Sequence, residues 1–246
     1  MCFITIDCGT TNSCVSVLNK EFKIINRDSA KIGVKDTVIS GSNEILRQGL
    51  KKLLLKAILG AGLDIRDIRF AITSGMITSE IGLFEIPHLR APVDLDDLVK
   101  GLRIIHNPQF FSVDIPMIFI PGVKNCFPHN AAYADVRKID FMRGEETEVI
   151  GLLSKYHNLP LPLTVIIMGS HTKYIYVNEQ KQICGSLTTL SGQIYEAIME
   201  ITSIGKSIRG SGNNRKPYLN TELIDISSDA VKYAGFLRAL LMPRFM

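Results

Sequence analysis

The residues best suited to phosphate chemistry form a small polar turn that follows an apolar run near the start of the chain. Asp7 ends that run. The turn itself consists of Gly9, Thr10, Thr11 and Asn12. Glycine lets a backbone approach a ligand closely, and turn amides and threonine hydroxyls can face phosphate oxygens. Asp7 could hold Mg²⁺, directly or through water, because magnesium prefers oxygen ligands. An ordinary hairpin turn would use the same residues, so this segment alone leaves both interpretations open.

A second small turn with hydroxyl side chains lies between apolar stretches further along the chain. Its residues are Gly169, Ser170, His171 and Thr172, and Lys173 follows them. Two such turns facing each other could clamp a polyphosphate from both sides. Taken singly, His171 is interpreted as a packing or surface histidine and Lys173 as a solvated charge. No G-x-x-x-x-G-K-[ST] sequence occurs, which argues against a P-loop nucleotide site.

The third segment whose side chains could take part in a reaction is the run Met142–Thr147, at the start of an expected helix. A carboxylate at a helix start, from Glu145 or Glu146, could accept a proton from a substrate hydroxyl. Arg143 could bind a carboxylate or a phosphate through a two-pronged contact. The alternative is plain negative charge in the first turn of a helix, which the helix dipole favours by itself.

The elements that would position these segments alternate between strands and helices. Short apolar runs predict strands at 3–6, 14–18, 21–26, 68–72, 117–120, 163–168, 173–177 and 182–184. The first three are joined by short turns, which indicates an antiparallel start. Helical spacing of apolar residues predicts helices from a cap at Ser42 or Asn43 to about 60, and at 94–102, 142–156, 191–204 and 228–242. Residues 75–93, 123–138 and 206–220 are expected to be irregular.

The overall composition restricts the class of protein. With 46% apolar and 21% charged residues among 246, the chain is expected to be globular. Its net charge of +4 is dispersed, which argues against a nucleic-acid partner. The densest basic stretch, 206–216, is rich in glycine, serine and asparagine and is interpreted as a solvated loop, with an anion-attracting lip as the alternative.

Cysteine usage and hydropathy indicate the compartment. The five cysteines form no C-x-x-C pair, so a zinc knuckle or redox motif is not expected. Their odd number and the absence of a secretory leader favour a cytoplasmic location. Apolar runs such as 161–168 are too short to span a bilayer, so no membrane partner is expected.

Seven segments together resemble the 2-dehydro-3-deoxygalactonokinase family of the actin-like ATPase, sugar kinase and Hsp70 superfamily. They are I-D-C-G-T-T-N at 6–12, T-S-G-M-I-T-S at 73–79, P-H-L at 87–89, I-P-G-V at 120–123, F-M-R-G-E-E-T at 141–147, M-G-S-H-T-K-Y at 168–174 and F-L-R-A-L-L at 236–241. The match is collinear over nearly the whole chain. M-R-G-E-E-T and G-S-H-T-K are specific to the family, whereas D-C-G-T-T-N alone indicates only the superfamily.

The resemblance implies an α/β fold of two ribonuclease-H-like halves with a central cleft, at 1–157 and 158–246. It implies transfer of the γ-phosphate of ATP, with Mg²⁺, to the terminal hydroxyl of the sugar acid 2-dehydro-3-deoxy-D-galactonate, in galactonate breakdown. Asp7 would organise the metal. The phosphates would be cradled by Gly9, Thr10, Thr11, Asn12, Gly169, Ser170, His171 and Thr172.

The same resemblance assigns the reacting groups. Glu145 would be the base, with Glu146 as the alternative, and Arg143 would lie near the reacting atoms. The sugar acid would lie against Ser74, Gly75 and Met76.

Three positions depart from the family pattern, and two of the departures leave other functions open. Cys8 stands where an aromatic residue is usual, which concerns packing only, whereas Gln193 stands where the family has a carboxylate. The chain also ends at Met246, before further strands and an adenosine-binding segment of the family, so the second half is expected to be incomplete. The alternatives are a truncated, inactive relative and a non-enzymatic protein that binds the sugar acid. The stereochemistry of the acid and the oligomeric state stay open.

Overall fold

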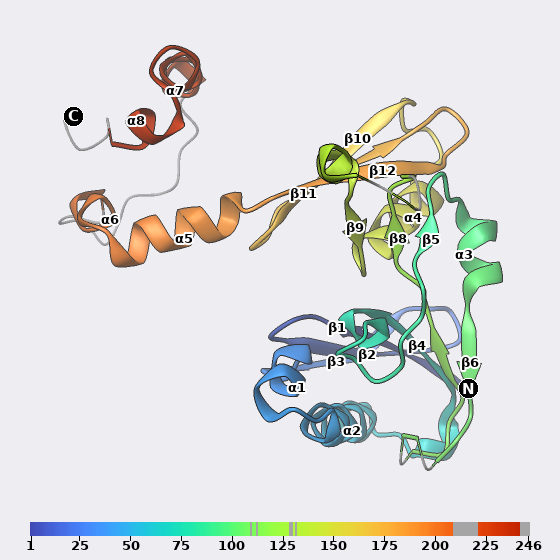
Figure 1. The fold of residues 1–246 in the computed structure, drawn as a ribbon. Coiled ribbons are helices and arrows are strands. Elements are labelled where there is room, and N and C mark those ends of the chain that lie inside the picture. Colours follow the sequence, from blue (N-terminus) through green and yellow to red (C-terminus); the bar gives the residue numbers. More distant parts are fainter. Residues whose placement is uncertain (109, 112, 128–129, 131, 209–220, 242–246) are drawn as a thin grey trace. The chain divides into compact units, whose positions relative to one another are not determined.

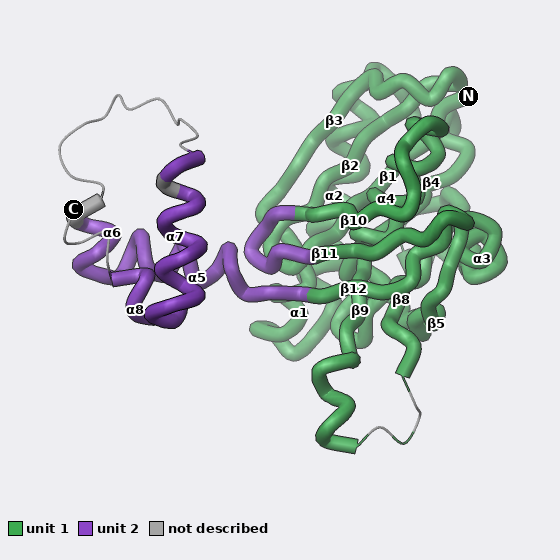
Figure 2. Tube along the Cα trace, turned by 90° about the horizontal axis from the view of Figure 1, so that it is seen from above, with its two compact units in different colours: residues 1–167, 174–187 green, residues 168–173, 188–246 purple. Residues whose placement is uncertain are grey.

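The computed structural model describes all residues except 109, 112, 128–129, 131, 209–220 and 242–246. The chain divides into two compact units, coloured separately in Figure 2. The first unit contains Met1–Ile167 and Tyr174–Leu187, and the second contains Met168–Lys173 and Thr188–Met246. The domain boundary expected from the sequence, between residues 157 and 158, stays a prediction.

A six-stranded sheet forms the larger part of the first unit (Figure 1). Its strands, in spatial order, are β3 (Ile24–Ala30), β2 (Ser13–Leu18), β1 (Cys2–Cys8), β4 (Ile68–Gly75), β7 (Met117–Phe119) and β6 (Arg103–Ile105). The first three strands are antiparallel, as the sequence predicts, and β4 runs parallel to β1 and to β7. The parallel pairing brings the carboxyl ends of β1 and β4 to the same edge of the sheet.

One face of this sheet is covered by helix α2 (Glu44–Gly60). Along β1, Ile4 and Ile6 are buried on that side, whereas Thr5 and Asp7 alternate onto the other face. The apolar stripe of α2 that packs here consists of Leu46, Leu50, Leu53, Leu54, Ala57 and Ile58. The 3.6-residue spacing of that stripe is the reason the helix was predictable from the sequence.

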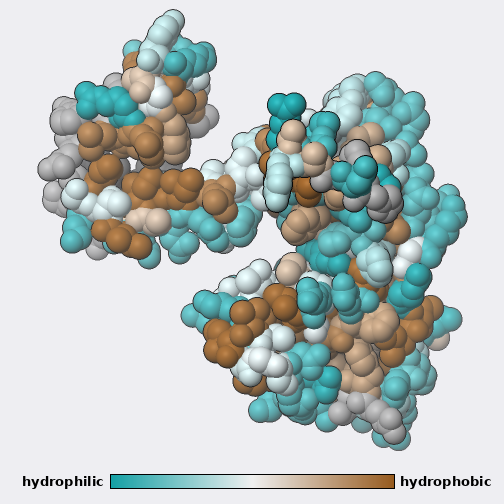
Figure 3. All heavy atoms as spheres, viewed as in Figure 1, coloured by the Kyte–Doolittle hydropathy of each residue, from teal (hydrophilic) through white to brown (hydrophobic). Residues whose placement is uncertain are grey.

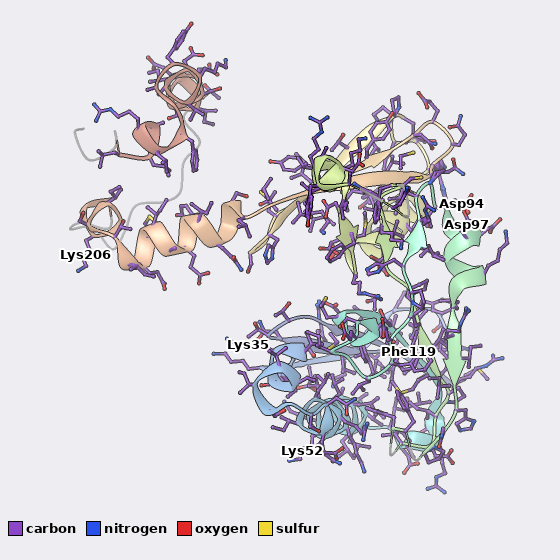
Figure 4. All side chains as sticks on the ribbon, in the orientation of Figure 1. Lys35, Lys52, Asp94, Asp97, Phe119 and Lys206 are labelled. Atoms are coloured by element: carbon purple, nitrogen blue, oxygen red, sulfur yellow. The ribbon has the colours of Figure 1, made fainter. Side chains whose placement is uncertain are left out.

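A short helix, α1 (Val34–Ser40), precedes α2 and was not predicted from the sequence. Figure 4 labels Lys35 in its first turn. The helix begins where the Asp36 carboxylate accepts the Gly33 N–H at 2.9 Å, and it ends at Gly41, with φ +69°. With only seven residues, the helix contains too few apolar repeats for their periodicity to predict it.

The rest of the first unit is built around a second buried cluster. A three-stranded sheet has the order β5 (Leu89–Arg90), β8 (Val123–Lys124) and β9 (Phe141–Met142). Another has the order β10 (Leu163–Ile167), β11 (Thr172–Val177) and β12 (Ile183–Thr189), of which the ends at 172–173 and 188–189 belong to the second unit. Helix α4 (Glu145–Lys155) buries Val149, Ile150 and Leu153 in this cluster.

Helix α3 (Leu95–Gly101) also belongs to this unit, and it is followed by strands β6 and β7 of the six-stranded sheet. The carboxylate of Asp94 accepts the Asp97 N–H at 3.0 Å, and the Asp97 carboxylate accepts the Asp94 N–H in return. Figure 4 labels both residues at the start of the helix. The buried Phe119, labelled in the same figure, packs its ring against Phe84 at a centroid distance of 5.6 Å.

The second unit contains helices α5 (Ser191–Ile201), α6 (Ser203–Ile208), α7 (Thr221–Ala234) and α8 (Phe236–Leu241). Figure 3 shows brown, apolar surface on several of these helices. Ile201, Tyr233 and Leu237 are among their exposed side chains. Within the described part of the chain, no helix combines the length and apolar character needed to cross a bilayer.

Several sequence expectations are corrected by these elements. The third strand begins at Ile24 rather than at 21, because the Asn19 side chain accepts the Glu21 and Lys23 amides and closes a turn there. The helix expected at 228–242 starts at Thr221 and is interrupted at Gly235, whose φ of +81° is incompatible with a right-handed helix.

The segments expected to be irregular are partly ordered. The predicted loop at 206–220 begins inside α6, and 209–220 lie outside the described residues. The stretch 123–138 contains β8 and a 3₁₀ helix, η3 (Tyr133–Lys138), in place of an uninterrupted loop.

Candidate functional site

The first polar turn lies at the end of β1, as the sequence predicts. Its carbonyl groups are held from outside: the Val34 and Lys35 amides donate to the Gly9 and Thr10 oxygens at 3.2 and 2.9 Å. A side chain at Gly33 would come within 2.7 Å of the Gly9 oxygen, so the start of α1 can press directly onto the turn.

The amides of this turn are therefore the groups left for a ligand. Gly9 N–H donates to the Asn12 oxygen at 2.9 Å. In the described part of the chain, the amides of Thr10, Thr11 and Asn12 make no backbone hydrogen bond. These residues are exposed, so their N–H groups can turn toward an anion such as a phosphate.

Two glycines with left-handed backbone bring Asp7 together with helix α4. Parallel pairing places Ser74 beside Asp7 and Gly75 beside Cys8. A Cβ atom at Gly75, where φ is +86°, would lie 2.6 Å from the Cys8 oxygen and 3.1 Å from Asp7 Oδ1. A Cβ atom at Gly144, where φ is +116°, would lie 3.3 Å from the Gly75 Cα. The end of β4 and the start of α4 thus touch next to the Asp7 carboxylate.

Gly75→Ala is accordingly expected to lower the free energy of unfolding by about 1–3 kcal/mol, the usual cost of a strained backbone residue. Urea unfolding measures this. The control is Gly151→Ala on the exposed side of α4, where an added Cβ meets nothing within 4 Å. That change is expected to be neutral or to stabilise by up to about 1 kcal/mol, because alanine is the better helix former. Equal losses in the two variants would contradict the close approach described above.

Three carboxylates interact electrostatically at this junction. Burial raises the pKa of the Asp7 carboxyl; Arg27 lowers it, and the negative charge of Glu145 raises it again. Burial also raises the pKa of Glu148, and Asp7 and Glu145 add to that effect. Glu148 was not recognised in the sequence. The available signal was its position three residues after Glu145, which puts both side chains on one helix face.

Glu145 and Glu146 are adjacent in sequence but have different environments. Glu146 is 1% exposed, and both of its carboxylate oxygens accept the Gly144 N–H, at 2.8 and 2.9 Å. Burial raises the pKa of Glu146 to about 7. Glu145 is partly exposed, and its Oε2 accepts the Arg143 N–H at 3.1 Å. Of the two, Glu145 is the one whose charge reaches Asp7.

The burial of Glu146 predicts a pH-dependent stability. Its pKa is about 7 when folded and 4.5 ordinarily, so the unfolded chain releases this proton first as the pH rises. The Glu146 contribution to folding should therefore decrease between about pH 4.5 and 7, by up to roughly 3 kcal/mol, and then level off. The measurement is the difference in unfolding free energy between the wild type and Glu146→Gln over this range. A difference independent of pH would exclude the buried titration.

Arg143 is engaged by the protein on the other side of the same junction. Its guanidinium donates to Thr78 Oγ1 at 2.8 Å and to the Ile86 oxygen at 2.7 Å, and it lies 3.4 Å from His88 Nδ1. These contacts brace the 3₁₀ turn η2 (Met76–Thr78), next to the residues expected to meet the sugar acid. A contact of Arg143 with a reacting group stays a prediction.

The second polar turn lies in the second unit, between β10 and β11. The Gln193 N–H donates to the Ser170 oxygen at 3.0 Å, and Ser191 Oγ donates to Thr172 Oγ1 at 2.8 Å. The start of α5 therefore holds this turn through its oxygens, as α1 holds the first turn. The prediction that both turns bind the same phosphates is neither confirmed nor contradicted by the described structure.

Lys173 corrects one sequence interpretation. It was interpreted as a solvated charge, but it is 5% exposed and its Nζ donates to Thr188 Oγ1 at 2.9 Å. The alternation along β11 puts Lys173 on the same face as the buried Ile175 and Val177, which explains the burial. His171, by contrast, is exposed, in agreement with its interpretation as a surface histidine.

No cluster of three or more histidine, cysteine, aspartate or glutamate residues in the described chain has metal-binding geometry. A single carboxylate at Asp7, completed by water and substrate phosphates, nevertheless fits the usual way in which proteins hold Mg²⁺. The residues present thus suit magnesium brought with a nucleotide better than a metal bound by the protein alone.

The strands and helices make the chain an α/β protein. The actin-like ATPase fold predicted from the sequence is confirmed by the similarity to a solved structure given below. The chain belongs to the 2-keto-3-deoxy-galactonokinase family, whose model matches residues 7–228. This is the family predicted from the sequence motifs, under a synonymous name. Its members are sugar kinases, which implies a nucleotide and a small sugar substrate.

One solved structure supports the fold. A candidate 2-dehydro-3-deoxygalactonokinase from Sinorhizobium meliloti has a TM-score of 0.66 at 17% identity, over 97% of this chain and 76% of that chain. A reductive activator for a corrinoid, iron-sulfur protein scores 0.45 at 13% identity, over 76% and 30% of the two chains. An activator of the 2-hydroxyisocaproyl-CoA dehydratase from Clostridium difficile, with bound ADPNP, scores 0.39 at 15% identity, over 99% and 72%. A search of curated proteins gave no match.

Proposed function

We propose that the chain transfers the γ-phosphate of ATP to the terminal hydroxyl of 2-dehydro-3-deoxy-D-galactonate, a step of galactonate breakdown. Family membership supports a sugar kinase, and the motifs at 73–79 and 141–147 support the sugar acid. The observation that carries the proposal is the contact between Gly75 and Gly144, which gathers Asp7, Ser74 and the first turn of α4 in one place.

The reaction needs one proton acceptor. The carboxylate of Glu145 takes the proton of the terminal hydroxyl while the hydroxyl oxygen bonds to the γ-phosphorus and the bond to the leaving oxygen of ADP breaks. Glu145 suits this role better than Glu146, because Glu146 is buried and both of its oxygens are occupied by the Gly144 amide. Ser74, Gly75 and Met76 line the place proposed for the sugar acid.

The remaining groups bind the phosphates and the metal ion or support the turn beside the sugar acid. The amides of Thr10, Thr11 and Asn12 hold the phosphates. Asp7 holds Mg²⁺, which neutralises phosphate charge when it is bound. Arg143 acts here as a brace, since its contacts with Thr78 and Ile86 keep the η2 turn against the start of α4.

The direct test is incubation of the protein with ATP, Mg²⁺ and 2-dehydro-3-deoxy-D-galactonate, with the phosphorylated acid and ADP measured by ³¹P NMR. Stoichiometric formation of both products supports the proposal. Calorimetric titration with the acid and with ATP separates the alternatives: binding of the acid without binding of millimolar ATP indicates a non-enzymatic sugar-acid-binding protein. The gluconate-derived isomer of the acid, run in parallel, decides the stereochemical preference.

A further inference from the structure

Arg27 on strand β3 lies on the same sheet face as Asp7. The strand register places Cys14 opposite Asp7 and Ser16 opposite Arg27. Since side chains alternate along a strand, Asp7, Cys14 and Arg27 point to one face, while their neighbours Ile6 and Val15 are buried on the other. Sequence reasoning missed Arg27, because the third strand was expected to end at 26, and the register that pairs Arg27 with Ser16 cannot be read from the order of residues.

The side chain of Arg27 extends diagonally, from its own cross-strand partner Ser16 toward Cys14, the partner of Asp7. Its Nε–H donates to Cys14 Sγ at 2.9 Å, a diagonal contact between neighbouring strands. Cys14 is the direct cross-strand partner of Asp7 on β1. The guanidinium therefore reaches the residue that pairs with Asp7, on the same sheet face as the carboxylate that the proposed function places at the metal.

The outer end of this guanidinium is available to a ligand. Within the described part of the chain, the Arg27 side chain forms no ion pair, and its one hydrogen bond runs from Nε to Cys14 Sγ. The side chain is exposed. The contrast with Arg143 is direct, since both terminal nitrogens of Arg143 already donate to protein oxygens. Of these two arginines, Arg27 is the one that can offer a two-pronged contact to an incoming oxyanion.

We propose that Arg27 binds the carboxylate of the sugar-acid substrate, with Cys14 Sγ orienting its guanidinium. This inference rests on the proposed function. A carboxylate and a phosphate share the oxyanion chemistry that a guanidinium recognises. The position of Arg27 favours the carboxylate. The open amides of the phosphate turn lie beyond the ends of β1 and β2. Arg27 instead pairs with Ser16, whose partner Thr5 lies two residues before Asp7 on β1.

Calorimetric titration of the wild type, Arg27→Gln and Arg27→Lys tests the assignment. The ligands are 2-dehydro-3-deoxy-D-galactonate, its uncharged carboxamide and ATP with Mg²⁺. Arg27→Gln is expected to weaken binding of the acid about 10- to 100-fold, the range for losing a hydrogen bond to a charged group. Arg27→Lys is expected to lose less affinity, because lysine keeps the positive charge but not the two-pronged contact of the guanidinium. Binding of the carboxamide and of ATP should be unchanged in both variants.

The matched control is Arg66→Gln, an exposed arginine of the 3₁₀ helix η1 (Ile65–Asp67) whose Nε pairs with Asp64 at 2.9 Å. It should leave all three affinities unchanged. Weaker binding of ATP in Arg27→Gln with unchanged binding of the acid would mean that Arg27 binds phosphate and would overturn the assignment. Equal losses for the acid and the carboxamide would also overturn it, because the charge would then not be recognised.

Turnover measured on the same proteins keeps the two proposals distinguishable. If the wild type binds the acid but transfers no phosphate, the proposed function fails, and the titration still decides the role of Arg27. If the wild type does not bind the acid at all, both proposals fail. In an active enzyme, Arg27→Gln should raise KM for the acid with little change in kcat, as expected when uniform binding is lost.

Discussion

Asp7→Ala should lower kcat by about 1,000-fold or more, because a metal ion and its ligand contribute several kcal/mol of charge stabilisation to phosphoryl transfer. Asp7 is placed for this role by the end of β1, the neighbouring Ser74 and the close approach of Gly75. The measurement is steady-state phosphorylation of the sugar acid at saturating ATP, with Mg²⁺ varied. The isosteric Asp7→Asn should lose nearly as much, because the amide removes the charge while keeping the shape.

The control for this prediction is Asp96→Ala, which removes an exposed carboxylate from the first turn of α3. Its turnover should equal that of the wild type. Thermal unfolding of each variant shows whether a loss of activity reflects the site or the fold. If Asp7→Asn keeps more than a tenth of the wild-type kcat, Asp7 does not organise the metal.

Glu145→Gln has the second largest expected effect. Removing a general base typically lowers kcat by about 10²- to 10⁴-fold. Glu146→Gln is the matched comparison, because it makes the same chemical change at the neighbouring position. We expect it to change kcat far less, since the Glu146 side chain is buried and both of its oxygens accept the Gly144 N–H.

The reverse outcome has a clear meaning. If Glu146→Gln abolishes turnover while Glu145→Gln is mild, the base is Glu146 and the start of α4 must rearrange when substrate binds. The pH profile separates this from a structural defect: a lost base removes a titration, whereas a loosened helix start lowers the rate at every pH.

Local patterns in the sequence were sufficient for most of the elements. The turn after Asp7 was recognisable from its glycine and threonines, and α2 from the spacing of its leucines, because both signals depend only on neighbours along the chain. The start of α4 was predicted within a few residues for the same reason. Where a single backbone conformation decided the outcome, as at Gly235, the pattern was not sufficient.

The candidate site was only partly predictable. The sequence alone determined the residue types: carboxylates, small turn residues and arginines suited to phosphate chemistry on an α/β frame. The tertiary structure decided their directions. It turned Glu146 inward and left Glu145 coupled to Asp7, it committed Arg143 to Thr78, and it placed Arg27 beside Cys14. Strand register and the contact of two left-handed glycines set those directions, and both depend on residues far apart in the chain.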